Sequence, residues 1–330
     1  MNVTSASSGH ANKVEKPAEG LAGLASLEAK VNALLPPRYQ CFDAVSPTSM
    51  GSAGLKYGAD ARVAWDQIWT HFCDLALAGG PPHRGSLLEP PTPEEVEADP
   101  AGNQLVTEEV VRGVRMTTGL AAAPAGPGWV AVRCRDEPTA AWLLRAVVAE
   151  NVFARRRGLD LHLPAGPWFR LAKEVKNVIV ALAKTCHYWD EHLSETERVT
   201  AAAAMEGDGA AVLLEPASRP EVLARESEYG TVATEMARAA GAATGWPAAP
   251  GRAGGWVRLT LPDLTTAAWF VRAAIAENVL ARREESVLYL PVPAPGQPGT
   301  EFEAVQRLAR ICRLWAGRTR PAGWGARHSL

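Results

Sequence analysis

The sequence contains little cysteine, and its cysteines are too scattered to form a shared site. They are Cys41, Cys73, Cys134, Cys186 and Cys312, an odd number with no C-x-x-C spacing. A disulfide framework or a structural zinc site normally uses paired, closely spaced cysteines. The pattern therefore argues against both and favours a reducing, cytoplasmic setting.

Long apolar runs and an excess of charge are also missing. No stretch approaches the roughly 18 uncharged apolar residues of a membrane-spanning helix, and residues 1–20 lack the apolar core of a signal peptide. The formal net charge of -2 excludes a strongly basic nucleic-acid-binding protein. We expect a soluble protein with neither a membrane nor a nucleic-acid partner.

Short motifs with a known chemistry are absent as well. The sequence has no G-x-S-x-G, H-E-x-x-H, G-x-G-x-x-G, P-loop or EF-hand pattern. Whether the protein is an enzyme, and which cofactor or metal it uses, is left open. What is present is ordinary globular composition, with 47% apolar and 21% charged residues over 330 positions. The 27 arginines against 7 lysines are typical of a protein encoded by a GC-rich bacterial genome.

The most informative feature is an internal repeat. Residues 139–156, TAAWLLRAVVAENVFARR, return as 266–283, TAAWFVRAAIAENVLARR, with 13 of 18 positions identical. Matching positions on both sides extend the similarity over about 108–190 and 234–316. A period this long indicates two duplicated domains and not a solenoid. We therefore predict an intrachain pseudo-dimer.

Hydrophobic periodicity gives each copy a predicted α+β architecture of the form ββαβα. In the first copy the strands are expected within 111–119, 129–133 and 159–164, and the helices over 139–156 and 173–192. Thr139, and Thr265 or Thr266, are the expected helix N-caps. A right-handed parallel β-α-β crossover would make the sheet mixed, with its helices on one face.

The remaining chain is divided by composition. We expect flexible tails at 1–24 and 321–330, and an N-terminal helix, hairpin and helix followed by a loop over 25–105. The copies are bounded at 106–197 and 234–320, and a linker over 198–233 joins them.

Two glutamates occupy matched positions on the repeated helices. Glu150 and Glu277 are surrounded by apolar residues at helical spacing, so both should be buried and hydrogen-bonded. If the helices meet at a pseudo-twofold axis, these carboxylates should converge there with Asn151 and Asn278. We favour a structural network between the copies, the alternative being a metal or acid–base site.

Candidate catalytic residues occur only in the first copy. Lys184, His187 and Glu191 lie about one turn apart on a predicted helix, where a His–Glu pair can orient a base or hold a metal. The second copy has arginines or glycine at these positions, so only one half could carry the site. The alternative is a freely varying solvated face.

The GGPPHRG segment, residues 79–85, supplies the candidate ligand-binding residues His83 and Arg84. Glycines with a basic pair can wrap an anion. The alternative is a rigid proline turn. We predict that both side chains face a cleft beside the first copy.

These features lead to two functional hypotheses. The first is a bacterial small-molecule-binding protein or enzyme that acts on an anionic metabolite, between the 79–85 loop and the first copy. The second is a non-catalytic pseudo-twofold scaffold or subunit whose partner is another protein.

Overall fold

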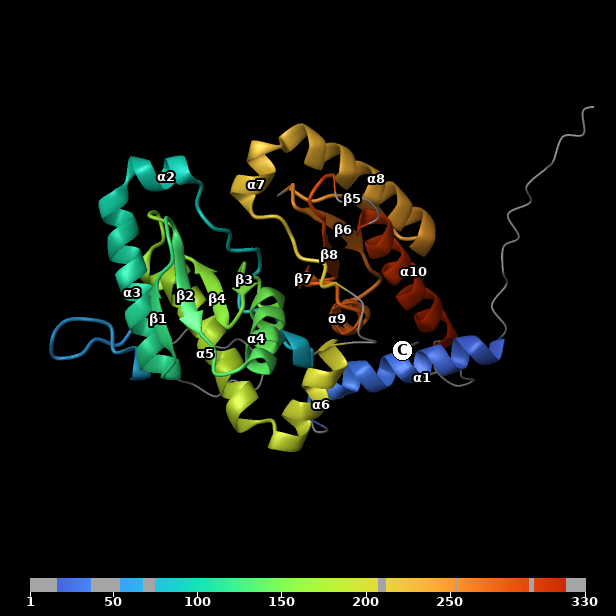
Figure 1. Ribbon diagram of the computed structural model, residues 1–330, viewed down its shortest axis with the longest axis horizontal. Helices are drawn as coiled ribbons and strands as arrows, with labels where there is room; N and C mark the ends of the chain where they lie inside the picture. The colour runs from blue at the N-terminus through green and yellow to red at the C-terminus, as the bar shows by residue number, and fades with distance from the viewer. Residues whose placement is uncertain are drawn as a thin grey trace, which may run out of the picture.

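The computed structural model describes residues 17–36, 54–67, 75–206, 212–252, 254–296 and 300–318. Its helices and strands form an α+β fold with two four-stranded sheets, which lie side by side in Figure 1. We call residues 87–193 the first unit and residues 213–318 the second unit.

Each unit contains one sheet and helices that pack on it. The first unit consists of α2 (Pro93–Ala98), α3 (Pro100–Thr118), β1 (Ala121–Pro124), β2 (Trp129–Arg133), α4 (Glu137–Ala149), β3 (Arg155–Arg157), β4 (Asp160–Pro164) and α5 (Lys176–Glu191), with a π-helical turn at Leu171–Val175. The second consists of α7 (Arg219–Ala224), α8 (Glu226–Thr244), β5 (Ala248–Pro250), β6 (Trp256–Thr260), α9 (Leu264–Ala276), β7 (Arg282–Glu284), β8 (Val287–Pro291) and α10 (Thr300–Arg318). The strand orders, β1-β2-β4-β3 and β5-β6-β8-β7, correspond position by position.

The predicted mixed sheet is wrong, because every strand pair in both sheets is antiparallel. The prediction lacked a strand, β3, which follows α4 and forms an antiparallel pair with β4. Because the chain turns back between β3 and β4, β4 runs antiparallel to β2, and no parallel β-α-β unit forms. The predicted strand at 111–119 is also wrong, since its residues form the end of α3 apart from Gly119, the left-handed C-cap.

One face of the first sheet is covered. Val130, Val132, Leu161 and Leu163 have no exposed surface, whereas the residues between them and before them on the two strands are partly exposed. This alternation is the period of a strand with one buried side. It agrees with helices that lie on a single face.

The repeated helices have matched ends. Asp136 and Asp263 are the N-caps of α4 and α9, accepting hydrogen bonds from the amides of Thr139 and Thr266 at 2.7 Å. The threonines predicted as caps lie inside the first turn, because aspartate also accepts amide hydrogen bonds and stands three residues earlier. Both helices stop where an asparagine adopts a left-handed backbone, at φ 62° and 56°. Asparagine tolerates this conformation better than most residues.

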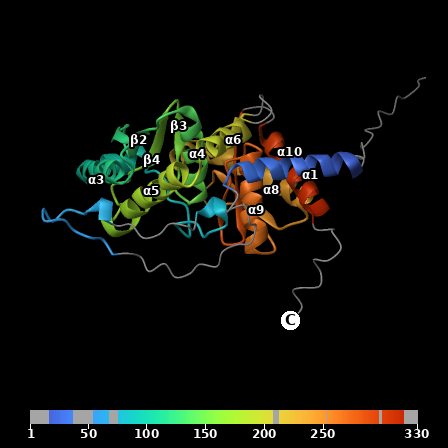
Figure 2. The same cartoon turned by 90° about the horizontal axis from the view of Figure 1, so that it is seen from below.

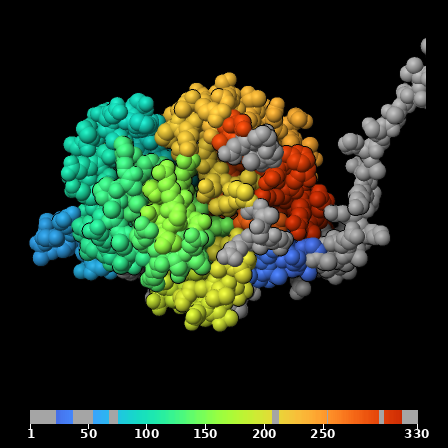
Figure 3. All heavy atoms as spheres, viewed as in Figure 1, coloured from blue at the N-terminus to red at the C-terminus, as the bar shows by residue number. Residues whose placement is uncertain are grey.

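The N-terminal part of the chain bridges the two units. Helix α1 (Pro17–Ala33) packs against α9 and α10 of the second unit and against α6 (Glu195–Glu206), as Figure 2 shows from below. In Figure 3 α1 (blue) and α6 (yellow) border the lower edge of both units. The predicted hairpin is confirmed by an antiparallel bridge between Tyr57 and Val63.

The middle of the helix predicted to follow that hairpin, residues 68–74, lies outside the described residues. The described parts of it are two short 3₁₀ turns, Trp65–Gln67 and Ala76–Ala78. Both predicted tails also fall largely outside the described residues. The predicted linker at 198–233 contains most of α6, all of α7 and the start of α8.

Candidate functional site

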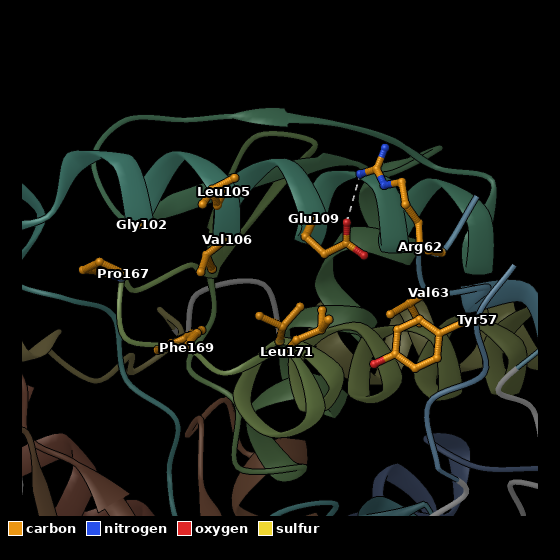
Figure 4. Close-up of a pocket in the computed structure, with 12 residues that line it drawn as sticks. Tyr57, Arg62, Val63, Gly102, Leu105, Val106, Glu109, Pro167, Phe169 and Leu171 are labelled. Atoms are coloured by element: carbon orange, nitrogen blue, oxygen red, sulfur yellow. Dashed lines mark hydrogen bonds and ion pairs between the residues drawn. The ribbon is translucent and has the colours of Figure 1, made fainter. Parts of the chain in front are cut away.

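An open pocket of about 440 Å³ lies on the first unit, between α3, the hairpin and the loop that leads into α5 (Figure 4). It is lined by Tyr57, Ala61, Arg62, Val63, Gly102, Leu105, Val106, Glu109, Pro167, Phe169, Leu171 and Val175. Most of these side chains are aliphatic or aromatic. The size and lining are those of a small-molecule site, in which a few polar groups fix the orientation of a ligand.

The inner wall of the pocket is anchored in the core, whereas its rim is exposed. Val63 and Val175 are buried, and Phe169 is 5% exposed. Tyr57 and Leu105 at the rim remain 59% and 68% exposed. Neighbouring exposed apolar side chains of this kind often mark a binding surface.

Glu109 forms the polar end of the pocket, where four N–H groups converge on its carboxylate. Trp65 Nε1 donates at 2.7 Å, Arg112 Nε at 3.0 Å and Arg62 Nη2 at 3.1 Å, and Arg112 Nη2 donates as well. Burial alone would raise the pKa of Glu109, but the hydrogen bonds from Arg112 and Trp65 outweigh it, so its pKa is lowered. Glu109 is therefore an ionised anchor for the arginines.

The two arginines at this anchor differ in how much of their donor capacity is used. Arg112 is mostly buried and also donates to the carbonyl of Val63 at 2.7 Å. Arg62 is 54% exposed, and its only side-chain partner among the described residues is Glu109. Most N–H groups of the Arg62 guanidinium are thus open to a ligand at the pocket mouth.

This pocket is not visible in sequence patterns, because its walls are far apart in the chain. Arg62 and Glu109 are 47 residues apart, and the loop at 167–171 follows much later. The available signal was α3 itself, where Leu105, Glu109 and Arg112 recur at helical spacing beside apolar residues. No pattern predicted that the hairpin would dock on that face.

The structure brings Lys184 and the 79–85 loop together at Glu150. The Glu150 carboxylate has no exposed surface and accepts hydrogen bonds from the Ala76 amide at 2.7 Å, the His83 amide at 2.7 Å and Lys184 Nζ at 3.0 Å. The predicted burial and hydrogen bonding of Glu150 are confirmed. Its partners are a lysine and two backbone amides.

Glu277 lies at the corresponding position of the second unit but has fewer hydrogen-bond partners for its carboxylate among the described residues. Its side chain is 8% exposed and pairs with Arg310 at 3.1 Å, so burial and a basic partner are confirmed here too. Arg310 stands at the position equivalent to Lys184 but is 46% exposed. The second carboxylate oxygen of Glu277, Oε1, is buried and has no hydrogen-bond partner among the described residues.

His83 and Arg84 lie against the first unit in different ways. The Nε2 atom of His83 is buried, and burial together with the charges of Lys184 and Lys176 lowers the pKa of His83 to about 3. Arg84 Nε donates to the carbonyl of Ser86, and burial lowers the pKa of Arg84. Neither side chain lines the pocket beside α3, and the cleft predicted to hold His83 and Arg84 stays a prediction.

The three candidate catalytic residues do not share one environment. Lys184 is 1% exposed and bonded to Glu150, whereas His187 and Glu191 are exposed. The His187 ring faces His192, with 5.1 Å between ring centroids. A joint role of Lys184 with this exposed pair remains a prediction.

Asparagines and arginines connect the two units. Asn151 Nδ2 donates to the carbonyls of Arg84 and Arg283, and Asn151 Oδ1 accepts from Arg282 at 3.1 Å. Arg145 Nη2 donates to Asn278 Oδ1 at 2.8 Å. Each asparagine therefore contacts the other unit, whereas the carboxylates bind partners within or beside their own units.

Comparison with models of known protein families, with curated proteins and with solved structures finds no match. Within the described ranges, no group of three or more His, Cys, Asp or Glu side chains is placed to hold a metal ion. In the same part of the chain no helix is long and apolar enough to cross a membrane.

Proposed function

We propose that this protein binds a small molecule with an apolar body and one anionic group in the pocket of the first unit. The observation that carries the proposal is the pairing of an apolar lining with Arg62, a half-exposed cation that has open donors. A guanidinium binds a carboxylate through parallel, charge-assisted hydrogen bonds. The apolar walls would take up the rest of the ligand.

As in the sequence-based hypothesis, the ligand is an anion and the first unit binds it. The site, however, lies beside α3 and not at the 79–85 loop. The 79–85 loop donates the His83 amide to Glu150, which also accepts hydrogen bonds from the Ala76 amide and from Lys184. With these groups already engaged, the loop suits a role in holding the first unit together. The pocket beside α3 retains open donors and open apolar surface.

The proposal also treats the two units as copies of one ancestral domain. Supporting this are the 13 identities in 18 positions, the matched strand orders and a tetrapeptide, Leu-Leu-Glu-Pro, that occurs at 87–90 and again at 213–216. Each Leu-Leu-Glu-Pro segment forms a parallel bridge next to the asparagine that follows α4 or α9. The hairpin that closes the pocket lies in the N-terminal part of the chain, before the first of these segments.

The alternative, a scaffold or subunit that binds a protein partner, is favoured by the exposed rim. Tyr57, Leu105 and Trp168 expose large apolar side chains near the pocket mouth. A partner covering this surface would bury them. The experiment below separates the two hypotheses, because a scaffold needs no affinity for small anions.

The test is a titration of the full chain with octanoate and with octan-1-ol. Binding is measured as displacement of the fluorescent probe anilinonaphthalenesulfonate. We expect octanoate to bind about tenfold more tightly, because a charged hydrogen bond contributes roughly 1.5–3 kcal/mol. Arg62→Gln should remove this preference. The matched control is Arg133→Gln, because Arg133 is similarly exposed (57%) but lies on β2 outside the pocket.

A second pair of variants tests the apolar wall. Leu171→Lys should weaken the binding of both octanoate and octan-1-ol. Leu223→Lys, which changes an exposed leucine of α7, should leave the binding of both compounds unchanged. Equal affinity for octanoate and octan-1-ol in the wild type, or equal losses in Arg62→Gln and Arg133→Gln, contradicts the proposal.

A further inference from the structure

A second cavity, of about 210 Å³, lies where the first unit meets α6 and the second unit. It is lined by Glu137, Pro138, Ala141, Arg145, Arg156, Ala202, Met205, Leu213 and Asn278. Two of these residues are arginines, and the only acid among them, Glu137, is 72% exposed. The cavity therefore combines two cations and an amide in a partly enclosed space.

Arg145 is a buried cation with incomplete partners. It is 5% exposed, and it donates to the carbonyls of Ala141 and Met205 and to Asn278 Oδ1. Its Nε–H is buried without a partner, and no carboxylate of the described residues lies within 4 Å of its guanidinium. Burial and the neighbouring Arg156 lower the pKa of Arg145 to about 10, although Glu215 opposes this at longer range. A buried cation is costly unless an anion compensates it.

Arg156 shows the same deficit when it is compared with Arg283, which stands at the equivalent position of the second unit. Arg283 is 3% exposed and donates to the carbonyls of Gly80 and Glu285, so the 79–85 loop supplies an oxygen to it. Arg156 is 32% exposed, and its nearest acid, Glu137, is 3.8 Å away. Arg283 therefore donates to carbonyl oxygens of the chain, whereas the equivalent Arg156 lines the cavity of about 210 Å³.

We infer that the cavity between Arg145, Arg156 and Asn278 binds a small phosphate-class oxyanion, either inorganic phosphate or the phosphate group of a small metabolite. The anion binds beside Arg156 at the position that corresponds to that of the Gly80 carbonyl beside Arg283. Arg156 supplies a guanidinium fork, Arg145 supplies a buried positive charge that Glu215 offsets only at longer range, and the volume accommodates a compact anion. The site is independent of the pocket beside α3, because none of its lining residues is shared.

The test is calorimetric titration of the full chain with inorganic phosphate at constant ionic strength, with phenyl phosphate and acetate as parallel titrants. We expect saturable phosphate binding that weakens at least about tenfold in Arg156→Gln, since a charge-assisted contact is lost. The matched control is Arg157→Gln, which removes the same charge from the neighbouring exposed residue and should leave binding unchanged. Phenyl phosphate binding as tightly as phosphate assigns the site to a phosphate monoester, and preference for free phosphate assigns it to the inorganic ion.

A second variant keeps both arginines and fills the cavity instead. Ala202→Phe places a ring at a partly exposed lining position and should abolish phosphate binding without changing the melting temperature much. Arg62→Gln, in the other pocket, should have no effect on phosphate. Lack of saturable binding, equal losses in Arg156→Gln and Arg157→Gln, or acetate binding as tightly as phosphate overturns the inference.

Discussion

Glu150 and Glu277 follow nearly identical helices, yet their surroundings differ. Glu150 is fully buried with a buried lysine and two backbone amides, whereas Glu277 has one half-exposed arginine and one oxygen without a partner among the described residues. Both amides that contact Glu150 come from residues 76–83, which precede the first unit. A repeated helix thus acquires different roles according to the segment that covers its C-terminal end.

The strongest test of this difference is to neutralise each carboxylate. Glu150→Gln should lower the free energy of unfolding by about 3 kcal/mol or more, because Lys184 is left buried without a counter-ion. Glu277→Gln should cost less than about 1 kcal/mol, since Arg310 is hydrated and screened. Urea denaturation of the two variants measures both values.

A double variant separates the charge from the packing. Glu150→Gln combined with Lys184→Met removes both members of the ion pair, so it should be more stable than Glu150→Gln alone. Equal losses in Glu150→Gln and Glu277→Gln would show that the two environments are energetically alike, contrary to the comparison.

The asparagines after the two helices provide a smaller contrast. Asn151→Gly keeps the left-handed backbone available but removes hydrogen bonds to Arg84, Arg283 and Arg282, and should cost about 2 kcal/mol. Asn278→Gly, which loses the bond from Arg145, should cost about 1 kcal/mol. Thermal denaturation at one pH compares them, and a larger loss for Asn278→Gly would reverse the expected order.

His83 is expected to contribute a pH dependence to the free energy of unfolding. Its pKa of about 3 in the folded chain lies below the ordinary histidine value of 6.5, so the unfolded chain binds a proton first as the pH falls. Stability is therefore unaffected above about pH 6.5 and declines below it, by at most roughly 1.4 kcal/mol per pH unit.

Unfolding at pH 7 and pH 5 tests this contribution. His83→Gln should lose less stability between the two values than the wild type, and His187→Gln, an exposed control, should behave as the wild type does. An unchanged pH dependence in His83→Gln would mean that His83 is not held neutral by its surroundings.

The pocket beside α3 shows the same division between the units. Leu105 lines it in the first unit, and the residue at the equivalent place on α8 is Thr231. The hairpin and the loop at 167–171 complete the pocket. The pocket of the first unit thus depends on segments that lie outside the strands and helices common to both units.

The repeated segment, the α+β class and the burial of both glutamates follow from local sequence, because they rest on residue spacing and on the cost of an unpaired buried charge. The predicted helix over 139–156 was too long for a local reason. Asn151 adopts a left-handed backbone, so α4 ends at Ala149 and residues 155–157 form β3.

Tertiary structure alone decided the antiparallel pairing, the partners of each carboxylate and the pockets. Lys184 meets Glu150 across 34 residues and Arg62 meets Glu109 across 47, and no periodicity along one element specifies which distant element docks on it. That choice depends on how the whole chain buries its apolar surface.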